Sequence, residues 1–149
     1  MTAERRDAPA PLHCLGHMDG VKSQERAFDQ AQFWARFMGA DAKAAKEALK
    51  AVGLGRRLDV PGRGLSAGQR RRLALSRLLI APRPIWLLDE PLAALDTDGQ
   101  ALVRSLVSEH CAKGGLVLTA MHGDGFENAR TLDMRDFMPN RKAKTGAMS

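Results

Sequence analysis

The sequence predicts an α/β fold with a mainly parallel sheet and a group of helices. Residues 85–88 form a continuous apolar run flanked by prolines, which is typical of a strand buried on both faces. The apolar run at residues 116–120 predicts the next buried strand. Helical patterns between residues 25 and 80 predict a group of helices ahead of both strands.

Length and composition bound the class of protein. The chain has 149 residues, enough for one domain at most, and its 44% hydrophobic and 27% charged residues are typical of a globular protein. No apolar segment is long enough to span a bilayer, and the polar residues 1–10 predict no signal peptide. Cys14 and Cys111 lack the spacing of metal ligands, so we expect reduced thiols.

The formal net charge of +6 allows nucleic acid or an anionic membrane surface as a partner. A globular domain that binds phosphate-rich nucleotides and docks on an acidic protein surface is compatible with the same charge. We favour this second explanation, and we expect no nucleic acid partner.

The chain opens with a polar segment, residues 1–11, that we expect to be a disordered lead-in. Residues 12–15 can form a short strand, and residues 16–22 a loop. Two histidines, His13 and His17, lie in this region, and we favour ordinary loop polarity over metal binding for both.

Two helices are predicted next. Apolar residues at helical spacing indicate a helix over residues 25–38, whose phenylalanines widen the apolar face that we assign to the core. Asp41 is expected to cap a second helix over residues 42–52, and Gly53 to end it.

A capping box opens the third helix. Ser66 can accept from the backbone N–H of Gln69, whose side chain can reach back to the Ser66 N–H. The helix is expected to run to Ile80, because Pro82 and Pro84 follow it. Its N-terminus has free N–H groups and the positive end of the helix dipole, so it can bind an anion.

Two carboxylates follow the strand at residues 85–88. Ligands of open α/β sheets bind at the carboxyl ends of the strands, where Asp89 can hold Mg²⁺ on a nucleotide. Neighbouring residues point in opposite directions, so Glu90 can face an attacking water as a general base. The alternative is a solvated acidic turn with no chemical role.

A second capping box, Thr97 with Gln100, predicts a helix that runs to about Ala112. The strand at residues 116–120 follows, and His122 stands at its carboxyl end, where a ligand can be reached. A lone histidine is more often structural or solvated, but its place one strand beyond a carboxylate pair favours a functional role.

The ordered set LSAGQ, LLDEP, ALD and a single histidine strongly resembles the nucleotide-binding domain of ABC ATPases, a P-loop NTPase fold. The resemblance covers about residues 12–136. It implies ATP and Mg²⁺ as cofactors, with Asp89 as the Walker B aspartate, Glu90 as the catalytic glutamate and His122 as the switch histidine. It also implies that a signature motif contacts the ATP held by an opposite subunit. The residues of this motif are Leu65, Ser66, Ala67, Gly68 and Gln69.

The same resemblance assigns two further loops. Leu95 and Asp96 resemble the D-loop, and residues 12–24 occupy the place of the Q-loop. Where the family has glutamine, this chain has Met18, whose thioether cannot bind Mg²⁺ in that way. We therefore expect Q-loop function to be altered.

The resemblance also divides the chain. A helical subdomain with the signature motif would span residues 25–80, and a part of the core with Walker B, D-loop and switch histidine would span residues 81–138. Residues 126–137 are expected to hold a short helix and a last strand. The basic tail at residues 139–149 is expected to be disordered.

Two short patterns are similar to the haem-exporter ATPases of cytochrome c biogenesis. They are the segment at residues 16–22 and the Phe33-Trp34-Ala35 sequence. This similarity implies the ATP-binding subunit of an exporter for a haem-related substrate. It further implies a second ATPase subunit in a head-to-tail dimer, integral membrane subunits, and a peripheral place on the cytoplasmic face of the inner membrane.

The phosphate-binding sequence G-x-x-x-x-G-K-[ST] does not occur in the 149 residues. We expect that these residues form the C-terminal part of such an ATPase and do not hydrolyse ATP alone. The alternative is a catalytically incompetent binding module that completes the ATP site of a partner. A DNA-repair or chromosome-structure ATPase lobe is disfavoured, because the chain has no long heptad helices.

Overall fold

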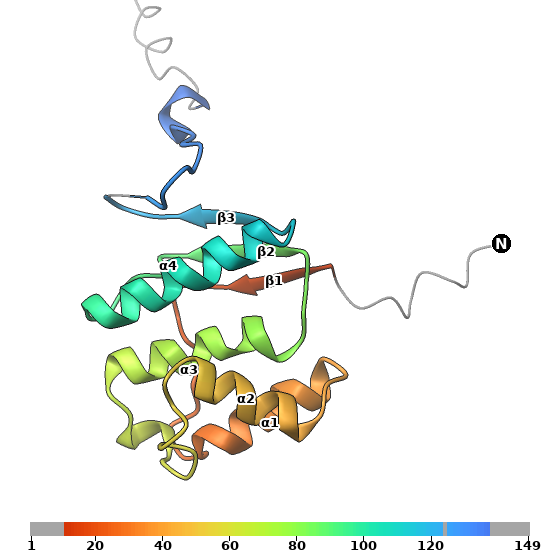
Figure 1. Cartoon of the computed structure of the whole chain (residues 1–149). Helices are drawn as coiled ribbons and strands as arrows, with labels where there is room; N and C mark the ends of the chain where they lie inside the picture. Colours follow the sequence, from red (N-terminus) through yellow and green to blue (C-terminus); the bar gives the residue numbers. More distant parts are fainter. Residues whose placement is uncertain (1–10, 124, 138–149) are drawn as a thin grey trace, which may run out of the picture.

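The computed structural model describes residues 11–123 and 125–137, and Figure 1 shows how the elements are arranged. The strands are β1 (Leu12–Leu15), β2 (Ile85–Asp89) and β3 (Leu116–Ala120); the α-helices are α1 (Ala27–Phe37), α2 (Ala42–Ala51), α3 (Ala67–Ile80) and α4 (Thr97–Ala112); the 3-10 helices are η1 (Gly62–Gly64) and η2 (Met134–Phe137). The predictions for residues 1–10 and 139–149 lie outside the described residues.

The three strands form one parallel sheet in the order β1-β2-β3. In this register Leu12 lies opposite Ile85, and Ile85 lies opposite Leu116. The carboxyl ends of all three strands therefore share one edge of the sheet. The predicted α/β class with a parallel sheet is confirmed.

Helices α3 and α4 cover one face of the sheet. The sheet contributes three side chains that are at most 3% exposed, namely Leu15, Trp86 and Leu88. The side chains that pack against them come from the two helices and include Ala74, Leu75, Leu78, Val103 and Val107. This cluster is the core that positions the end of β2.

The opposite face of the sheet is open among the described residues. Leu116 is 55% exposed and Leu118 is 52% exposed, and both point away from α4. Successive side chains of a strand point to opposite faces, so helices on one face leave every second side chain uncovered. The prediction of a buried strand at residues 116–120 is therefore wrong. The prediction of burial on both faces of β2 is wrong as well, because Ile85 and Leu87 are only partly buried.

Helices α1 and α2 lie on the side of α3 that faces away from the sheet, and the three helices pack together as a second group (Figure 1). The face of α1 that packs in this group is a row of buried alanines, Ala27, Ala31 and Ala35. Phe28 packs partly buried against this core, as predicted, whereas the prediction is wrong for Phe33, which is 50% exposed, and Phe37, which is 74% exposed. Small side chains let the helices approach closely, and the bulky rings lie beside the contact.

Helix α3 belongs to both cores. Its Leu73 and Ile80 pack with α1 and α2, whereas its Leu75 and Leu78 pack with the sheet and α4. A helix that is apolar on two sides is buried between two layers. The helical group and the sheet are therefore joined through α3.

The helix caps follow the prediction in two cases of three. Asp41 accepts from the Ala44 N–H and caps α2, as predicted. The third case is wrong: Asp96, not Thr97, caps α4, and its carboxylate accepts from the Gly99 N–H at 2.8 Å. Aspartate is as good an N-cap as threonine or better, so it takes the position one residue earlier.

The end of the described chain also differs from the prediction. Of the short helix and last strand expected in residues 126–137, the described residues contain only the 3-10 helix η2. Phe126 packs partly buried against the sheet core, whereas Leu132, Met134 and Phe137 are each about two-thirds exposed.

Candidate functional site

Three of the predicted site residues meet at the carboxyl edge of the sheet. Asp89 is the last residue of β2, Glu90 follows it, and His122 lies two residues beyond β3. His122 Nε2 is 3.7 Å from Glu90 Oε1. The His122 side chain is fully exposed, whereas that of Glu90 is 25% exposed. This pair can hold a water molecule or a phosphate oxygen between a carboxylate and an imidazole.

The backbone of Glu90 adopts a conformation that is uncommon for a residue with a side chain. Its φ angle is +47°, in the left-handed region. The Glu90 N–H donates to the Ala120 carbonyl at 2.8 Å, which ties the residue to β3. Such a conformation costs about 1–3 kcal/mol and persists only where neighbouring contacts impose it. The carboxylate is therefore placed by its surroundings.

Arg71 provides the hydrogen bonds to the backbone carbonyls of Asp89 and Glu90. It lies on α3 and is only 2% exposed. Its Nη2 donates to the Asp89 carbonyl at 2.7 Å and to the Glu90 carbonyl at 2.8 Å. Sequence reasoning missed this residue, because Arg70, Arg71 and Arg72 form a run that is typical of a solvated helix face. No signal in the sequence sets the middle arginine apart.

Residues 65–69, which resemble the signature motif and are called the signature turn below, have the predicted capping box. The Gln69 N–H donates to Ser66 Oγ at 3.1 Å, and the Ser66 N–H donates to Gln69 Oε1 at 3.0 Å. The next residues, Ala67 and Gly68, begin α3 with little side chain over the backbone. A helix start of this kind offers free N–H groups to an anion.

The residues that resemble the D-loop lie beside the signature helix. Leu95 is 8% exposed and packs in the sheet core. Nη2 of Arg72 lies 3.2 Å from Oδ1 of Asp96, so an ion pair joins α3 to the N-cap of α4. The hydrogen bond from the Gly99 N–H, and then the bond from Arg72, hold the pKa of the Asp96 carboxyl below its ordinary value. Asp96 is thus stabilised as an anion.

Met18 stands apart from these groups. Its side chain is 86% exposed, on the loop between β1 and α1. The same loop is held to α3, because Arg71 Nη1 donates to the Gly16 carbonyl and to Asp19 Oδ1, each at 3.0 Å. Arg77 Nη2 adds a bond to the Asp19 carbonyl at 2.7 Å. The loop backbone is fixed, and the thioether points into solvent.

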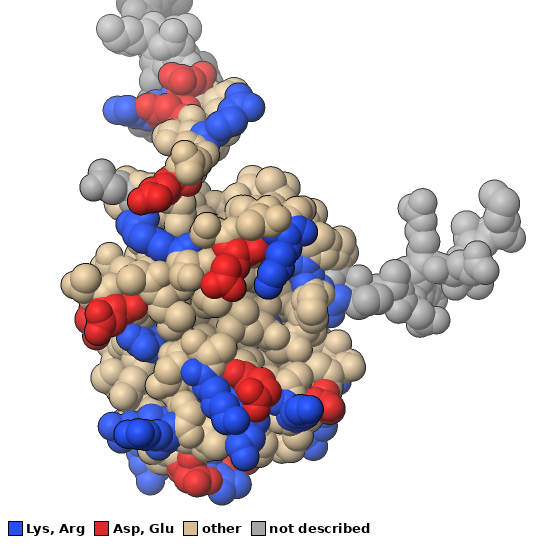
Figure 2. All heavy atoms as spheres, in the orientation of Figure 1, with Lys and Arg blue, Asp and Glu red and all other residues tan. Residues whose placement is uncertain are grey.

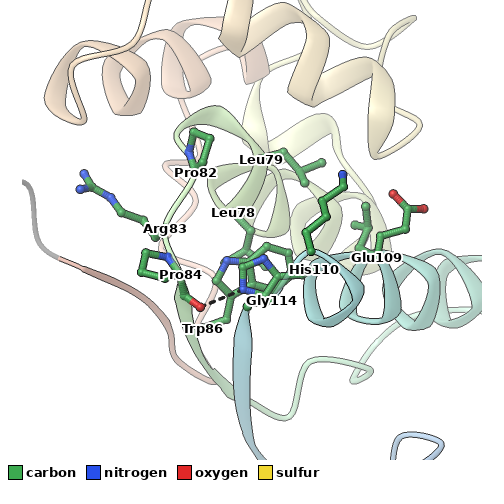
Figure 3. A pocket seen from close by; sticks show the side chains of 12 residues that line it. Leu78, Leu79, Pro82, Arg83, Pro84, Trp86, Glu109, His110 and Gly114 are labelled. Atoms are coloured by element: carbon green, nitrogen blue, oxygen red, sulfur yellow. Dashed lines mark hydrogen bonds between the residues drawn. The ribbon is translucent and has the colours of Figure 1, made fainter.

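A cavity of about 420 Å³ lies at the other end of β2 (Figure 3). The His110 ring stacks on Trp86 there, with ring centroids 3.8 Å apart, and its Nε2 lies 3.2 Å from the Pro84 carbonyl oxygen. Pro84 and Trp86 precede the carboxylates along β2, so this cavity is not part of the carboxylate site.

Charges of both signs alternate on the face shown in Figure 2. Arg26 pairs with Asp29 at 2.7 Å and with Asp59 at 3.2 Å, and Lys50 pairs with Glu47 at 3.0 Å. Acidic partners thus neutralise part of the basic charge of the helical group.

Comparisons with known proteins agree with this arrangement. Residues 2–93 match the family described as ABC transporter. The cytochrome c biogenesis ATP-binding export protein CcmA of Bradyrhizobium diazoefficiens is 47% identical over 114 residues, which are 76% of this chain and 57% of that relative. The protein of the same name from Rhizobium meliloti is 42% identical over 131 residues, which are 85% of this chain and 63% of the relative.

Solved structures show the same fold. The dimeric post-hydrolysis state of the ATP-binding cassette MJ0796, bound to ADP and Pi, superposes with a TM-score of 0.68 and 26% identity, covering 75% of this chain and 52% of that chain. A second dimeric structure of MJ0796, a bacterial ABC transporter cassette, has a TM-score of 0.64. The chain spans just over half the length of the curated relatives that it matches. It belongs to the ABC transporter family of ATP-binding proteins.

Proposed function

We propose that the chain is part of the ATP-binding subunit of an ABC transporter that energises export of a haem-related substrate for cytochrome c-type biogenesis. The names of the relatives support the transport role. The observation that carries the proposal is the 3.7 Å approach of His122 to Glu90, directly after Asp89. A carboxylate and an imidazole at the carboxyl edge of a parallel sheet suit hydrolysis of a bound nucleotide.

In this proposal Glu90 is the general base. Its carboxylate accepts a proton from the water that attacks the γ-phosphate, and a general base contributes about 10²–10⁴-fold to the rate. His122 lies across from it, where its imidazole can donate to a phosphate oxygen. The tie between the Glu90 N–H and the Ala120 carbonyl keeps the base in place.

Asp89 suits Mg²⁺ on a nucleotide. The described residues contain no group of three or more side chains able to hold a metal alone. Mg²⁺ that arrives with a nucleotide does not need such a group, because phosphates and waters supply most of its ligands. Asp89 is exposed at the end of β2 and can supply one carboxylate oxygen. Mg²⁺ held there with a nucleotide would supply positive charge to stabilise the phosphates during transfer.

The remaining site residues act across a subunit interface in this proposal. The signature residues Leu65, Ser66, Ala67, Gly68 and Gln69 would contact ATP held by a second ABC ATPase subunit in a head-to-tail dimer, and Leu95 and Asp96 would form the D-loop beside them. The dimeric structures of MJ0796 support a dimer as the working form. The helix start at Ser66 supports the binding of an anion there.

We further propose a division of labour along the chain. Residues 12–24 form the Q-loop region, residues 25–80 the helical subdomain, and residues 81–138 the catalytic part. The two apolar cores that meet at α3 support this division. No helix within the described ranges is both long and apolar enough to cross a membrane. Integral membrane subunits would supply the pathway, with this subunit peripheral on the cytoplasmic face of the inner membrane.

The test uses the complete ATPase, meaning this chain together with a segment that carries G-x-x-x-x-G-K-[ST]. We expect Glu90→Gln to leave ATP binding intact and to lower turnover about 100-fold or more. Glu109→Gln, on the exposed face of α4, is the matched control and should leave turnover unchanged. Unchanged turnover in Glu90→Gln would refute the role of Glu90.

Met18 favours a second candidate function. The chain would then be a binding module that lends its signature turn to the ATP of a partner, because a thioether cannot replace a glutamine oxygen as a Mg²⁺ ligand. Met18→Gln separates the two. Faster Mg²⁺-dependent turnover in the complete ATPase would support the first function. No turnover in either form, with stimulation of a partner that supplies the phosphate loop, would support the second.

A further inference from the structure

We propose that Arg71 is a positioning residue, which holds the backbone of Glu90 in its left-handed conformation and couples it to the loop that carries Met18. This inference rests on the proposed function in so far as Glu90 is the base. The guanidinium of Arg71 binds the backbone carbonyls of Asp89 and Glu90 rather than their carboxylates. It acts through the two peptide groups that precede and follow Glu90.

The guanidinium of Arg71 joins two separate segments of the chain. Nη2 binds the carbonyl oxygens of Asp89 and Glu90 at 2.7 and 2.8 Å. Nη1 binds the carbonyl oxygen of Gly16 and the carboxylate of Asp19, each at 3.0 Å. One planar group therefore connects the end of β2 to the loop after β1.

The chemistry of this contact requires arginine. A guanidinium presents its N–H groups in a rigid fork, so one side of the fork can serve the loop while the other serves the strand end. Lysine has three donors on one nitrogen and cannot span both sets of acceptors. The charge is also buried, since Arg71 is 2% exposed, and Asp19 is the carboxylate that neutralises it. The four acceptors satisfy Nη1 and Nη2 of this buried group, whereas its Nε has no hydrogen-bond partner among the described residues.

The contact explains why Glu90 can keep a φ of +47°. The Glu90 N–H is taken by the Ala120 carbonyl, and the carbonyls of Asp89 and Glu90 are both taken by Arg71. Both peptide groups around Glu90 are thus hydrogen-bonded in the strained conformation. Without Arg71 the two carbonyls lose their partner, and the backbone can relax to negative φ, which turns the carboxylate away from His122.

The same contact couples the loop to the base. Gly16 and Asp19 flank the Met18 position, and both bind the guanidinium that also holds Glu90. A shift of the loop therefore reaches Glu90 through one rigid side chain. We infer that a change at the Met18 loop alters the geometry of the base without any direct contact between Met18 and Glu90.

The first experiment needs only the 149-residue chain. Backbone ¹³C shifts and three-bond couplings of Glu90, measured by NMR, report on its φ angle. We expect Arg71→Met and Arg71→Lys to move Glu90 to negative φ. Arg83→Met is the control, because Arg83 is half-buried just before β2, at the opposite end of that strand from Glu90. Glu90 should keep its positive φ in that variant.

The second experiment measures the effect on the complete ATPase. We expect Arg71→Lys to lower kcat by about 100-fold, the effect of misplacing a reacting group by about 1 Å, with the KM for ATP unchanged. Arg83→Met should keep kcat within about twofold. A purely stabilising role of Arg71 would lower the amount of active enzyme and leave the pH profile of kcat as it was. A displaced base shifts that profile.

Two outcomes would overturn the proposal. One is a Glu90 that keeps its positive φ in both Arg71 variants. The other is unfolding of both variants while Arg83→Met stays folded, since that would make Arg71 a requirement for the fold itself. If the wild-type complete ATPase shows no turnover, the proposed function fails. The NMR experiment then still decides whether Arg71 positions Glu90.

Discussion

The Ala94 carbonyl oxygen lies 3.0 Å from the position that a Cβ atom on Gly68 would occupy. The signature turn and the turn after β2 are therefore in backbone contact within this chain. Ala94 has a φ of +61°, so its turn is itself in the left-handed region and has little freedom to move.

This contact predicts the effect of Gly68→Ala. Alanine favours a helix over glycine by up to about 1 kcal/mol, but a methyl group against a fixed carbonyl costs about 1–3 kcal/mol. We expect a net loss in the free energy of unfolding, measured with urea. Gly125→Ala is the control, because nothing lies within 4 Å of its added Cβ. A more stable Gly68→Ala would show that the two turns are not in tight contact.

His13 predicts a dependence of stability on pH. Burial of the ring lowers its pKa, with help from the positive charges of Arg83 and His110, against the opposing bond between Nε2 and the Ala81 carbonyl. A lowered pKa means that the unfolded chain binds the proton more readily. The contribution of His13 to stability is therefore complete above its ordinary pKa of 6.5 and is lost as the pH falls from there towards its folded pKa.

The measurement for His13 is urea unfolding at several pH values between about 7.5 and 5.5, above the range in which ordinary carboxyl groups titrate. We expect His13→Gln to flatten the decline in the free energy of unfolding, because the amide keeps an N–H donor but binds no proton. An equal decline in both proteins would contradict the assignment.

The contact of Gly115 with His110 leads to a prediction about the stacking of His110 on Trp86. A Cβ atom on Gly115 would overlap the His110 ring, which lies against Trp86. Gly115→Ala should push the imidazole off the indole and uncover Trp86, which is 3% exposed in the wild type. The ¹H–¹⁵N indole signal of Trp86 should shift and its hydrogen exchange should accelerate. An unchanged indole signal would contradict this, and Gly125→Ala again serves as the control.

Much of the fold is predictable from local patterns. The parallel strands, the helices and the Ser66 cap depend on apolar spacing and capping residues that are visible in the sequence. Burial on both faces of β2 and β3 was predicted wrongly, because it depends on what covers each face. The sequence pattern records that Leu116 and Leu118 are apolar, but it does not record that α3 and α4 lie on the same side.

The candidate site was likewise predictable only in part. The motif order places Glu90 and His122 at one edge, and the structure brings them within 3.7 Å. Arg71 could not be predicted, because its role depends on tertiary contacts with two distant segments rather than on its neighbours. Thr97 was preferred to Asp96 as the N-cap because Thr97 and Gln100 have the sequence spacing of a capping box. The cap is decided by where the chain turns.

The position of α3 between the two cores has a consequence for how the chain melts. Leu73 and Ile80 cannot leave the helical group without also pulling Leu75 and Leu78 out of the sheet core, because all four belong to one rigid helix. The helical group and the sheet core therefore unfold together, and neither has an unfolding transition of its own. We expect one cooperative unfolding transition with heat or denaturant. A destabilising substitution in either layer should lower the midpoint of that transition.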